Sequence, residues 1–218
     1  MDRRPLAGLG PLARRLDAEL ASKDAVRERT IALSRELVRT CSEAIRALRE
    51  SGRAAKALGR ADRLSAELRK VTDGHPELHS SGTVQNALQE LAEAHILESL
   101  LSGRAIAAPS AYGCTPAAFL LGMGDAIGEL RRISQDALRR GDIREAGDAL
   151  HVMEGLFATL SAFDYPDAIV PLRHKQDVAR GLIEKTRGEV AVAARGRDLE
   201  RKIAALEKVL ARHAPRGR

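Results

Sequence analysis

The sequence predicts an all-α protein, and two observations carry that prediction. Nearly every long segment has apolar residues three or four positions apart, and hardly any segment alternates apolar and polar residues as a half-buried strand would. The chain has 218 residues, 44% of them apolar, which is enough to bury a hydrophobic core. Because no internal repeat or low-complexity linker divides the chain, we expect one helical-bundle domain of about seven helices.

The first three helices follow from one apolar stripe and two breaks. Helices are predicted over residues 5–21 and 24–50, and an Arg-rich helix over 53–71. The stripe of the second helix consists of Val26, Ile31, Leu33, Leu37, Val38, Ile45 and Leu48. Gly52 ends that helix, because glycine is the usual residue just after a helix, and the run from Thr72 to Pro76 ends the next one.

The remaining helices are also bounded by local signals. They are predicted over residues 84–101, 116–140, 143–163 and 168–212, with a loop over 102–115. Thr115-Pro116 supplies an N-cap and a proline at the first helical position, and Gly141-Asp142 separates the next two helices. We expect an interruption near Gly196, where Asp198 can cap a new helix with the stripe Leu199, Ile203, Leu206 and Leu210.

Composition argues against several function classes. Three Phe, two Tyr and no Trp are too few for an RNA-recognition sheet or barrel that stacks bases on aromatic rings. Two cysteines, Cys41 and Cys114, cannot build a disulfide framework or a Cys-rich zinc site, which favours reduced thiols in the cytoplasm. No N-terminal apolar signal segment and no apolar run near the ~20 residues of a membrane span are present. We therefore expect a soluble protein without a membrane partner.

The charge favours a polyanionic partner. The formal net charge is +6, and 29 of the 36 basic residues are arginine, which binds phosphate in bidentate fashion. The excess lies late in the chain, because residues 171–218 carry 13 basic and 6 acidic residues. This region is either a solvated basic tail or a surface that faces RNA.

Four carboxylates form two pairs at helical spacing. Glu90 and Glu93 lie three apart on one predicted helix, and Asp125 and Glu129 lie four apart on the next, so each pair shares a helix face. Consecutive helices can pack antiparallel and bring the pairs together, where they would repel unless Mg²⁺ or Mn²⁺ bound them. The same spacings also occur on solvated helix surfaces, so both interpretations stay open.

The surroundings of the second pair make a close approach possible. Gly122, Gly124 and Gly128 flank the two acids and would let another backbone or a substrate come near. The chain has no phosphate-binding Gly-x-x-x-x-Gly-Lys loop, Gly-x-Ser-x-Gly elbow, His-Glu-x-x-His motif or Glu-x-x-His motif. The usual signatures of nucleotide, acyl-transfer, zinc-protease and di-iron sites are therefore missing.

Two segments carry a resemblance to a known family. Residues 88–94 read LQELAEA and residues 119–130 read FLLGMGDAIGEL, and the stretches at 141–142 and 165–188 follow in the same order. Together they resemble the translin superfamily, and within it the translin-associated factor X (Trax) branch, over roughly residues 23–194. The resemblance implies an all-α subunit that forms a hollow homo-octamer and binds single-stranded RNA, with single-stranded DNA as a further ligand.

The resemblance also implies a reaction and a site. In the Trax pattern, a Glu-x-x-Glu on one helix and an Asp-x-x-x-Glu on the next bind the catalytic metal. The matching residues here, expected to be both catalytic and metal-binding, are Glu90, Glu93, Asp125 and Glu129. We therefore expect a Mg²⁺- or Mn²⁺-dependent endoribonuclease that cleaves single-stranded RNA with metal-activated water. Arg131 and Arg132 are candidate phosphate contacts, although ordinary exposed helix arginines are the plainer interpretation.

Parts of the chain depart from the family pattern. The basic, aromatic-containing RNA-binding segment of translin would fall near residues 75–85, which hold His75 and His79 but no arginine or aromatic ring. The tail after Asp198 extends past the matched region, so we expect a translin-like domain over residues 1–197 and a basic helical extension over 198–218.

Two other functions stay open at this point. One is a non-catalytic, translin-like scaffold that binds single-stranded RNA or DNA. The other is an unrelated bundle that binds a partner through its stripe at residues 199–210. His95 is expected to be a packing or surface residue, and Tyr112 either packs in its loop or stacks on a base.

Overall fold

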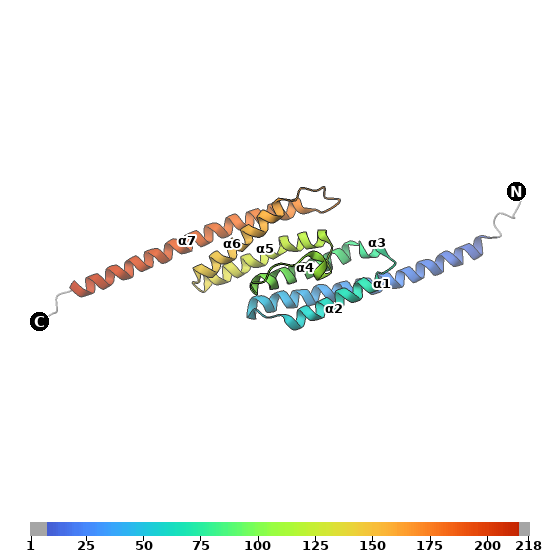
Figure 1. Ribbon diagram of the computed structural model, residues 1–218, viewed down its shortest axis with the longest axis horizontal. Coiled ribbons are helices and arrows are strands. Elements are labelled where there is room, and N and C mark those ends of the chain that lie inside the picture. The colour runs from blue at the N-terminus through green and yellow to red at the C-terminus, as the bar shows by residue number, and fades with distance from the viewer. Residues whose placement is uncertain (1–7, 214–218) are drawn as a thin grey trace. The chain divides into compact units, whose positions relative to one another are not determined.

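The computed structural model describes residues 8–213, which form α-helices and one short 3-10 helix, with no strand in that range (Figure 1). The elements are α1 (Leu9–Ser51), α2 (Ala55–Val71), α3 (Pro76–His79), α4 (Gly82–Leu101), η2 (Pro109–Tyr112), α5 (Pro116–Arg139), α6 (Ile143–Ser161) and α7 (Leu172–His213). The all-α prediction is confirmed. Residues 5–7 of the first predicted helix and 214–218 of the predicted extension lie outside the described residues.

The chain forms two compact units, and the boundary between them follows Gly122 inside α5. The first unit contains α1 to α4, η2 and the start of α5, and the second contains the rest of α5 with α6 and α7. The division into residues 1–197 and 198–218 stays a prediction. Within residues 8–213, no helix combines the length and the apolarity needed to cross a membrane.

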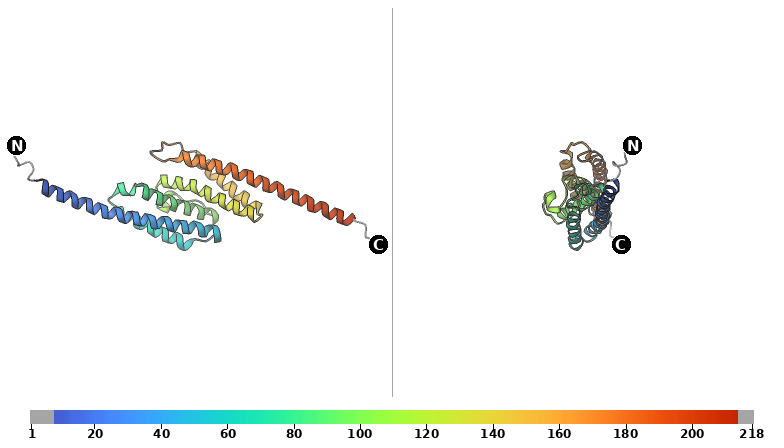
Figure 2. Two further views of the ribbon diagram at one scale, coloured as in Figure 1. Left: turned by 180° about the vertical axis from the view of Figure 1, so that it is seen from behind. Right: turned by 90° about the vertical axis from the view of Figure 1, so that its right-hand side faces the viewer.

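Helix α1 corrects the sequence prediction, because the break expected between residues 21 and 24 does not occur. Asp24 can cap a new helix, but here it pairs with Arg27 at 3.4 Å inside a continuous one. Neither glycine nor proline stands at this point, so nothing stops the helix before Gly52, whose φ of 67° ends it as predicted. Within the first unit, the N-terminal half of α1 extends well past α2 (Figure 2).

The core of the first unit lies between the second half of α1 and helices α2 and α4, which pack along it. Its fully buried large side chains are Leu37, Leu48, Leu68, Val84, Leu91, Ile96 and Leu97. Of the predicted α1 stripe, Leu33, Leu37, Ile45 and Leu48 are buried and the other three are half-buried. Ion pairs from Arg29 to Glu67 and from Arg60 to Glu36 join the outer faces of α1 and α2.

The start of α5 is held by the predicted cap. Thr115 Oγ1 accepts a hydrogen bond from Ala118 N at 3.2 Å and donates one to Gln85 Oε1 of α4 at 2.7 Å. The loop before it, predicted over residues 102–115, contains only the 3-10 turn η2. One threonine therefore both caps α5 and ties it to α4.

The second unit is organised by α6. Gly141 has a φ of 76°, and Asp142 caps α6 by accepting a hydrogen bond from Glu145 N at 3.0 Å, as the sequence predicts. Gln176 of α7 donates to the carbonyl oxygens of Leu160 and Phe163, both at 2.9 Å. The α6 and α7 side chains that fill the space between these helices are Met153, Leu156, Leu160, Leu172, Ala179 and Ile183.

Helix α7 differs from the prediction at its start and near Gly196. It begins at Leu172 rather than residue 168, because Pro171 disfavours helical geometry at the residue before it. The predicted interruption is wrong, since α7 runs unbroken through Gly196. A single glycine destabilises a helix by only about 1 kcal/mol, and Asp198 pairs with Arg201 and Lys202 on its own helix instead of capping a new one.

Candidate functional site

Helix α4 carries the first acid pair into a protein interior. Glu93 is only 7% exposed and Glu90 is half-buried, on a helix that is buried over most of its circumference. Buried carboxylates are rare, because removing a charge from water is unfavourable. Glu93 is therefore the acid whose position least resembles a solvated helix surface.

The thiol of Cys41 on α1 lies in the same electrostatic environment as this pair. Burial raises the pKa of Cys41, and the charges of Glu90 and Glu93 raise the pKa further. Cys114, which donates to the carbonyl oxygen of Leu88 at 3.3 Å, has a pKa raised to about 12, chiefly by burial. Both cysteines are free and buried.

Gly122 brings the backbone of α5 directly onto α4. A Cβ atom at this position would lie 2.5 Å from Gln89 O and 2.9 Å from Glu93 N. Only glycine fits such an approach without moving one of the two backbones. The expectation that the glycine-rich stretch admits another backbone is confirmed at Gly122, and the contact falls on the α4 turn that carries Glu90 and Glu93.

The rings near α4 have structural partners. Tyr112 stacks between His95 and Phe119, at centroid distances of 4.8 and 6.2 Å. Its hydroxyl lies 3.1 Å from Ser99 Oγ, and His95 Nε2 lies 2.7 Å from Asp62 Oδ1. The packing roles considered for His95 and Tyr112 are therefore confirmed.

Helix α5 carries the second acid pair, and both acids have cationic neighbours within the second unit. Lys175 Nζ of α7 donates to Asp125 Oδ1, and the Lys175 stem passes over Gly124, 3.3 Å from where a Cβ would lie. Glu129 Oε1 lies 3.3 Å from Arg132 Nε. Sequence reasoning missed Lys175, because nothing local links it to a carboxylate fifty positions earlier.

The two arginines after Glu129 differ in their surroundings. Arg131 is 15% exposed and donates to Leu182 O at 3.3 Å, Thr186 Oγ1 at 2.6 Å and Glu189 Oε1 at 2.8 Å. Its guanidinium therefore holds α5 against α7 and is not the exposed helix arginine considered above. Arg132 is 63% exposed. Of the two expected phosphate contacts, Arg132 is the accessible one.

The two acid pairs belong to different compact units, and each pair alone supplies two carboxylates. Within residues 8–213, the structure gathers no three His, Cys, Asp or Glu side chains in an arrangement that could hold a metal ion. Binding of a cation by all four acids stays a prediction.

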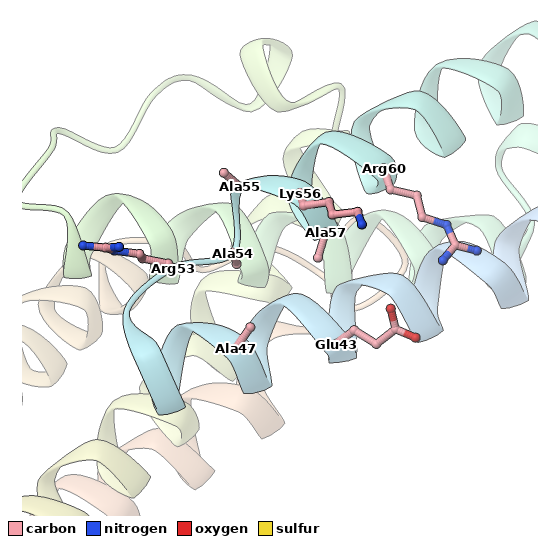
Figure 3. Close-up of a pocket in the computed structure, with 8 residues that line it drawn as sticks. All are labelled: Glu43, Ala47, Arg53, Ala54, Ala55, Lys56, Ala57 and Arg60. Carbon is pink, nitrogen blue, oxygen red and sulfur yellow. The ribbon is translucent and has the colours of Figure 1, made fainter.

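Open cavities lie elsewhere in the first unit. One of about 660 Å³ is at the turn between α1 and α2, where four small alanines and the charged residues Arg53, Lys56, Arg60 and Glu43 line it (Figure 3). None of the four candidate acids lines it. Its basic rim is a surface feature separate from the acid pairs.

Comparison with known proteins finds similar chains and similar solved structures, whereas no protein-family model matches the chain. An uncharacterized protein of Methanocaldococcus jannaschii is 30% identical over 172 residues, which is 78% of either chain. The crystal structure of AfC3PO is 33% identical with a TM-score of 0.77, and the match covers 85% of this chain and 98% of that one.

Two further structures support the same relationship. AfC3PO in complex with duplex RNA gives a TM-score of 0.76, again at 33% identity, over 85% of this chain and 97% of that chain. Apo-NeC3PO, at 22% identity and a TM-score of 0.75, covers 84% of this chain and 97% of that chain and shows the fold alone. Because the match to AfC3PO, a translin/Trax-type protein, spans nearly its whole length, the chain belongs to the translin superfamily, as a Trax-like member.

Proposed function

We propose that the chain is a metal-dependent endoribonuclease subunit. Its catalytic, metal-binding site consists of Glu90, Glu93, Asp125 and Glu129. The observation that carries the proposal is the close approach of Gly122 to the backbone of α4. Its contact with Gln89 and Glu93 seats the start of α5 on the α4 turn that bears the first pair, and Asp125 follows Gly122 within one helical turn.

The chemistry of the donor set fits a hard divalent cation. Four carboxylates with no thiol or imidazole among them suit Mg²⁺ or Mn²⁺ rather than zinc or copper. Glu90, Glu93 and Asp125 would hold the ion, and Glu129 would complete the set or accept a proton from water. When bound, such a cation polarises a phosphodiester oxygen and lowers the pKa of a water molecule.

The basic side chain of Arg132 binds the RNA backbone in this proposal. Arg132 lies beside Glu129 and is mostly exposed, so its guanidinium can hold a backbone phosphate next to the acids. The complex of AfC3PO with duplex RNA supports RNA as the ligand of this chain too. Single-stranded RNA is the substrate that the resemblance implies, and single-stranded DNA is the further candidate. We propose a homo-oligomer, an octamer by the same resemblance, located in the cytoplasm.

Cleavage of end-labelled RNA tests the proposal directly. Single-stranded and duplex RNA of one sequence are incubated with the protein in Mg²⁺, Mn²⁺, Ca²⁺ or a chelator, beside Asp125→Ala and Glu129→Ala. Cleavage in Mg²⁺ or Mn²⁺ that both substitutions abolish is the expected result. Asp136→Ala on the same helix is the matched control, because Asp136 pairs with surface Arg139. Equal cleavage by the wild type and the two variants would overturn the proposal.

A second candidate is the non-catalytic RNA-binding scaffold. The ion pair between Lys175 and Asp125 favours it, because the pair gives Asp125 a structural role without any metal ion. This function predicts that RNA is bound with and without Mg²⁺ and is never cut.

A further inference from the structure

A second cavity in the first unit has the chemistry of an anion site. It measures about 410 Å³ and lies where the middle of α1 meets the first turn of α4. Its lining residues are Ser34, Arg35, Val38 and Arg39 from α1, with Thr83 and Asn86 from α4. Among the described residues that line it there is no carboxylate, in contrast to the cavity of Figure 3, which includes Glu43.

The sequence spacing explains why these residues converge. Positions 34, 35, 38 and 39 share one face of α1, and Thr83 and Asn86, three apart, share one face of α4. Helix α1 packs along α4, so the two faces meet. Ser81, Gly82 and Thr83, where the chain enters α4, all have small side chains.

Ser34 is the first sign of a binding site. It is 1% exposed, and its Oγ has no hydrogen-bond partner within the described part of the chain. Other hydroxyls on α1 bond to carbonyl oxygens one turn earlier, as Thr30 does to Val26 O at 2.8 Å and Ser42 to Val38 O at 3.0 Å. A buried hydroxyl without a partner is unfavourable and needs an explanation, and a bound group that accepts or donates a hydrogen bond supplies one.

Arg35 and Arg39 are the second sign. They lie four apart on one helix face, where like charges repel each other. Both are exposed, and within residues 8–213 neither forms an ion pair, although Arg29 on the same helix pairs with Glu67. An anion between the two guanidinium groups would turn this repulsion into attraction.

The N-terminus of α4 lies beside the same cavity, because Thr83 of its first turn lines it. Ser81, the N-cap, makes no side-chain hydrogen bond to the helix, and no acidic residue stands in the first turn. The first amides of this 20-residue helix therefore keep their donors and the positive end of the helix dipole for another group. Guanidinium, hydroxyl and amide groups all donate hydrogen bonds, and the oxygen atoms of a phosphate group accept them.

We propose that this cavity, the Arg35/Arg39 pocket, binds a backbone phosphodiester of RNA and so forms a grip on the substrate away from the four acids. The proposal rests on the proposed function for the identity of the ligand. RNA and free inorganic phosphate both present a phosphate group, so inorganic phosphate is the other ligand that the pocket could bind.

The first test measures RNA affinity without cleavage. Full-length protein in Ca²⁺ is titrated with fluorescent RNA over a range of salt concentrations, beside the double variant Arg35→Ala/Arg39→Ala. Expected is a loss of affinity of about tenfold or more and a salt slope smaller by about two, as for two lost phosphate contacts. The control, Arg53→Ala/Lys56→Ala in the cavity of Figure 3, removes the same charge and should change affinity less than threefold. Equal losses in both variants, or none in either, would overturn the proposal.

The second test uses Ser34→Ala. Because its hydroxyl has no partner among residues 8–213, the substitution should leave the thermal midpoint unchanged or raise it, while RNA affinity falls severalfold. A lowered midpoint with unchanged affinity would mean a purely structural serine and would contradict the proposal.

Two further measurements distinguish RNA binding by the Arg35/Arg39 pocket from cleavage at the four acids and from binding of free phosphate. Arg35→Ala/Arg39→Ala should still cleave at saturating RNA, whereas Asp125→Ala should bind RNA and fail to cleave, so the two proposals fail independently. If inorganic phosphate raises the thermal midpoint of the wild type but not of the arginine variant, while both bind RNA equally, the pocket is a free-phosphate site and the RNA assignment is wrong. A wild type that binds no RNA overturns it as well.

Discussion

Lys175 of α7 donates a hydrogen bond to Asp125 of α5, and the two side chains are only 27% and 25% exposed. The ammonium group thus neutralises the carboxylate at the position where the proposed function places a divalent cation. A metal ion bound there would compete with Lys175 for Asp125, and the lysine compensates the charge of the partly buried acid.

Replacing Lys175 by methionine should therefore lower the Mg²⁺ concentration needed for half-maximal cleavage severalfold, because the competing cation is gone. The measurement is the rate of RNA cleavage against Mg²⁺ concentration. Lys185→Met, at an exposed position of the same helix, is the control and should leave the curve in place. An unchanged metal requirement in Lys175→Met would show that the ion pair has no part in metal binding.

Gly122→Ala should destabilise the protein by about 1–3 kcal/mol, because the new methyl group would overlap backbone atoms of Gln89 and Glu93 that cannot move freely. Urea unfolding followed by circular dichroism gives the free energy of unfolding. Gly155→Ala on α6 is the control, since nothing lies within 4 Å of its Cβ and alanine favours helix by up to about 1 kcal/mol. The opposite order of stabilities would refute the close packing of α5 on α4.

Arg131 and Arg132 should separate stability from RNA binding. Arg131→Met removes three hydrogen bonds that join α5 to α7 and should lower the free energy of unfolding by about 2 kcal/mol. Arg132→Met should leave stability within about 0.5 kcal/mol and weaken RNA binding, since its exposed guanidinium is the proposed phosphate contact. Unfolding curves and RNA titrations of both variants check this, and equal RNA affinity for Arg132→Met and the wild type would remove Arg132 from the interface.

The raised pKa values of Cys41 and Cys114 predict slow alkylation and a loss of stability at high pH. The folded chain keeps both thiols protonated above pH 9, whereas the unfolded chain ionises there, so the contribution is intact below pH 9. It is lost as pH rises from about 9 toward the raised pKa of about 12 for Cys114. Iodoacetamide labelling at pH 8.5 should be far slower than in denaturant, and unfolding curves from pH 8 to 10.5 should shift less in Cys41→Ala/Cys114→Ala. Fast labelling of the native protein would contradict the burial of both thiols.

The sequence predicted what local chemistry determines. Thr115 and Asp142 cap their helices as expected, because a cap needs only residues within one turn. The same local logic failed at Asp198, where ion pairs inside a continuous helix replaced the expected cap, and the break expected between residues 21 and 24 does not occur either. Residues that favour a helix start also tolerate a helix interior, so single acids mark boundaries weakly.

In the candidate site, too, the sequence predicted local features and missed partners that are distant in the chain. Spacing identified the four acids and the glycine-rich stretch, and the contact of Gly122 with α4 confirms why one of those glycines is present. Spacing could not identify Lys175 beside Asp125 or the hydrogen bonds of Arg131, because those partners come from α7, about fifty residues away. The unsatisfied hydroxyl of Ser34 is likewise visible only once the packing of α1 is known.

The N-terminal half of α1 carries a stripe of exposed leucines that bears on how experiments with this chain are compared. Leu9, Leu12, Leu16 and Leu20 lie along it, and each is about half exposed or more. A stripe of this kind is rarely left in water and is covered by another surface in an assembly. In the proposed homo-oligomer, mass action then makes the thermal midpoint rise with protein concentration. Nanomolar binding assays and micromolar unfolding experiments would sample different populations, so variants are comparable only at matched subunit concentration.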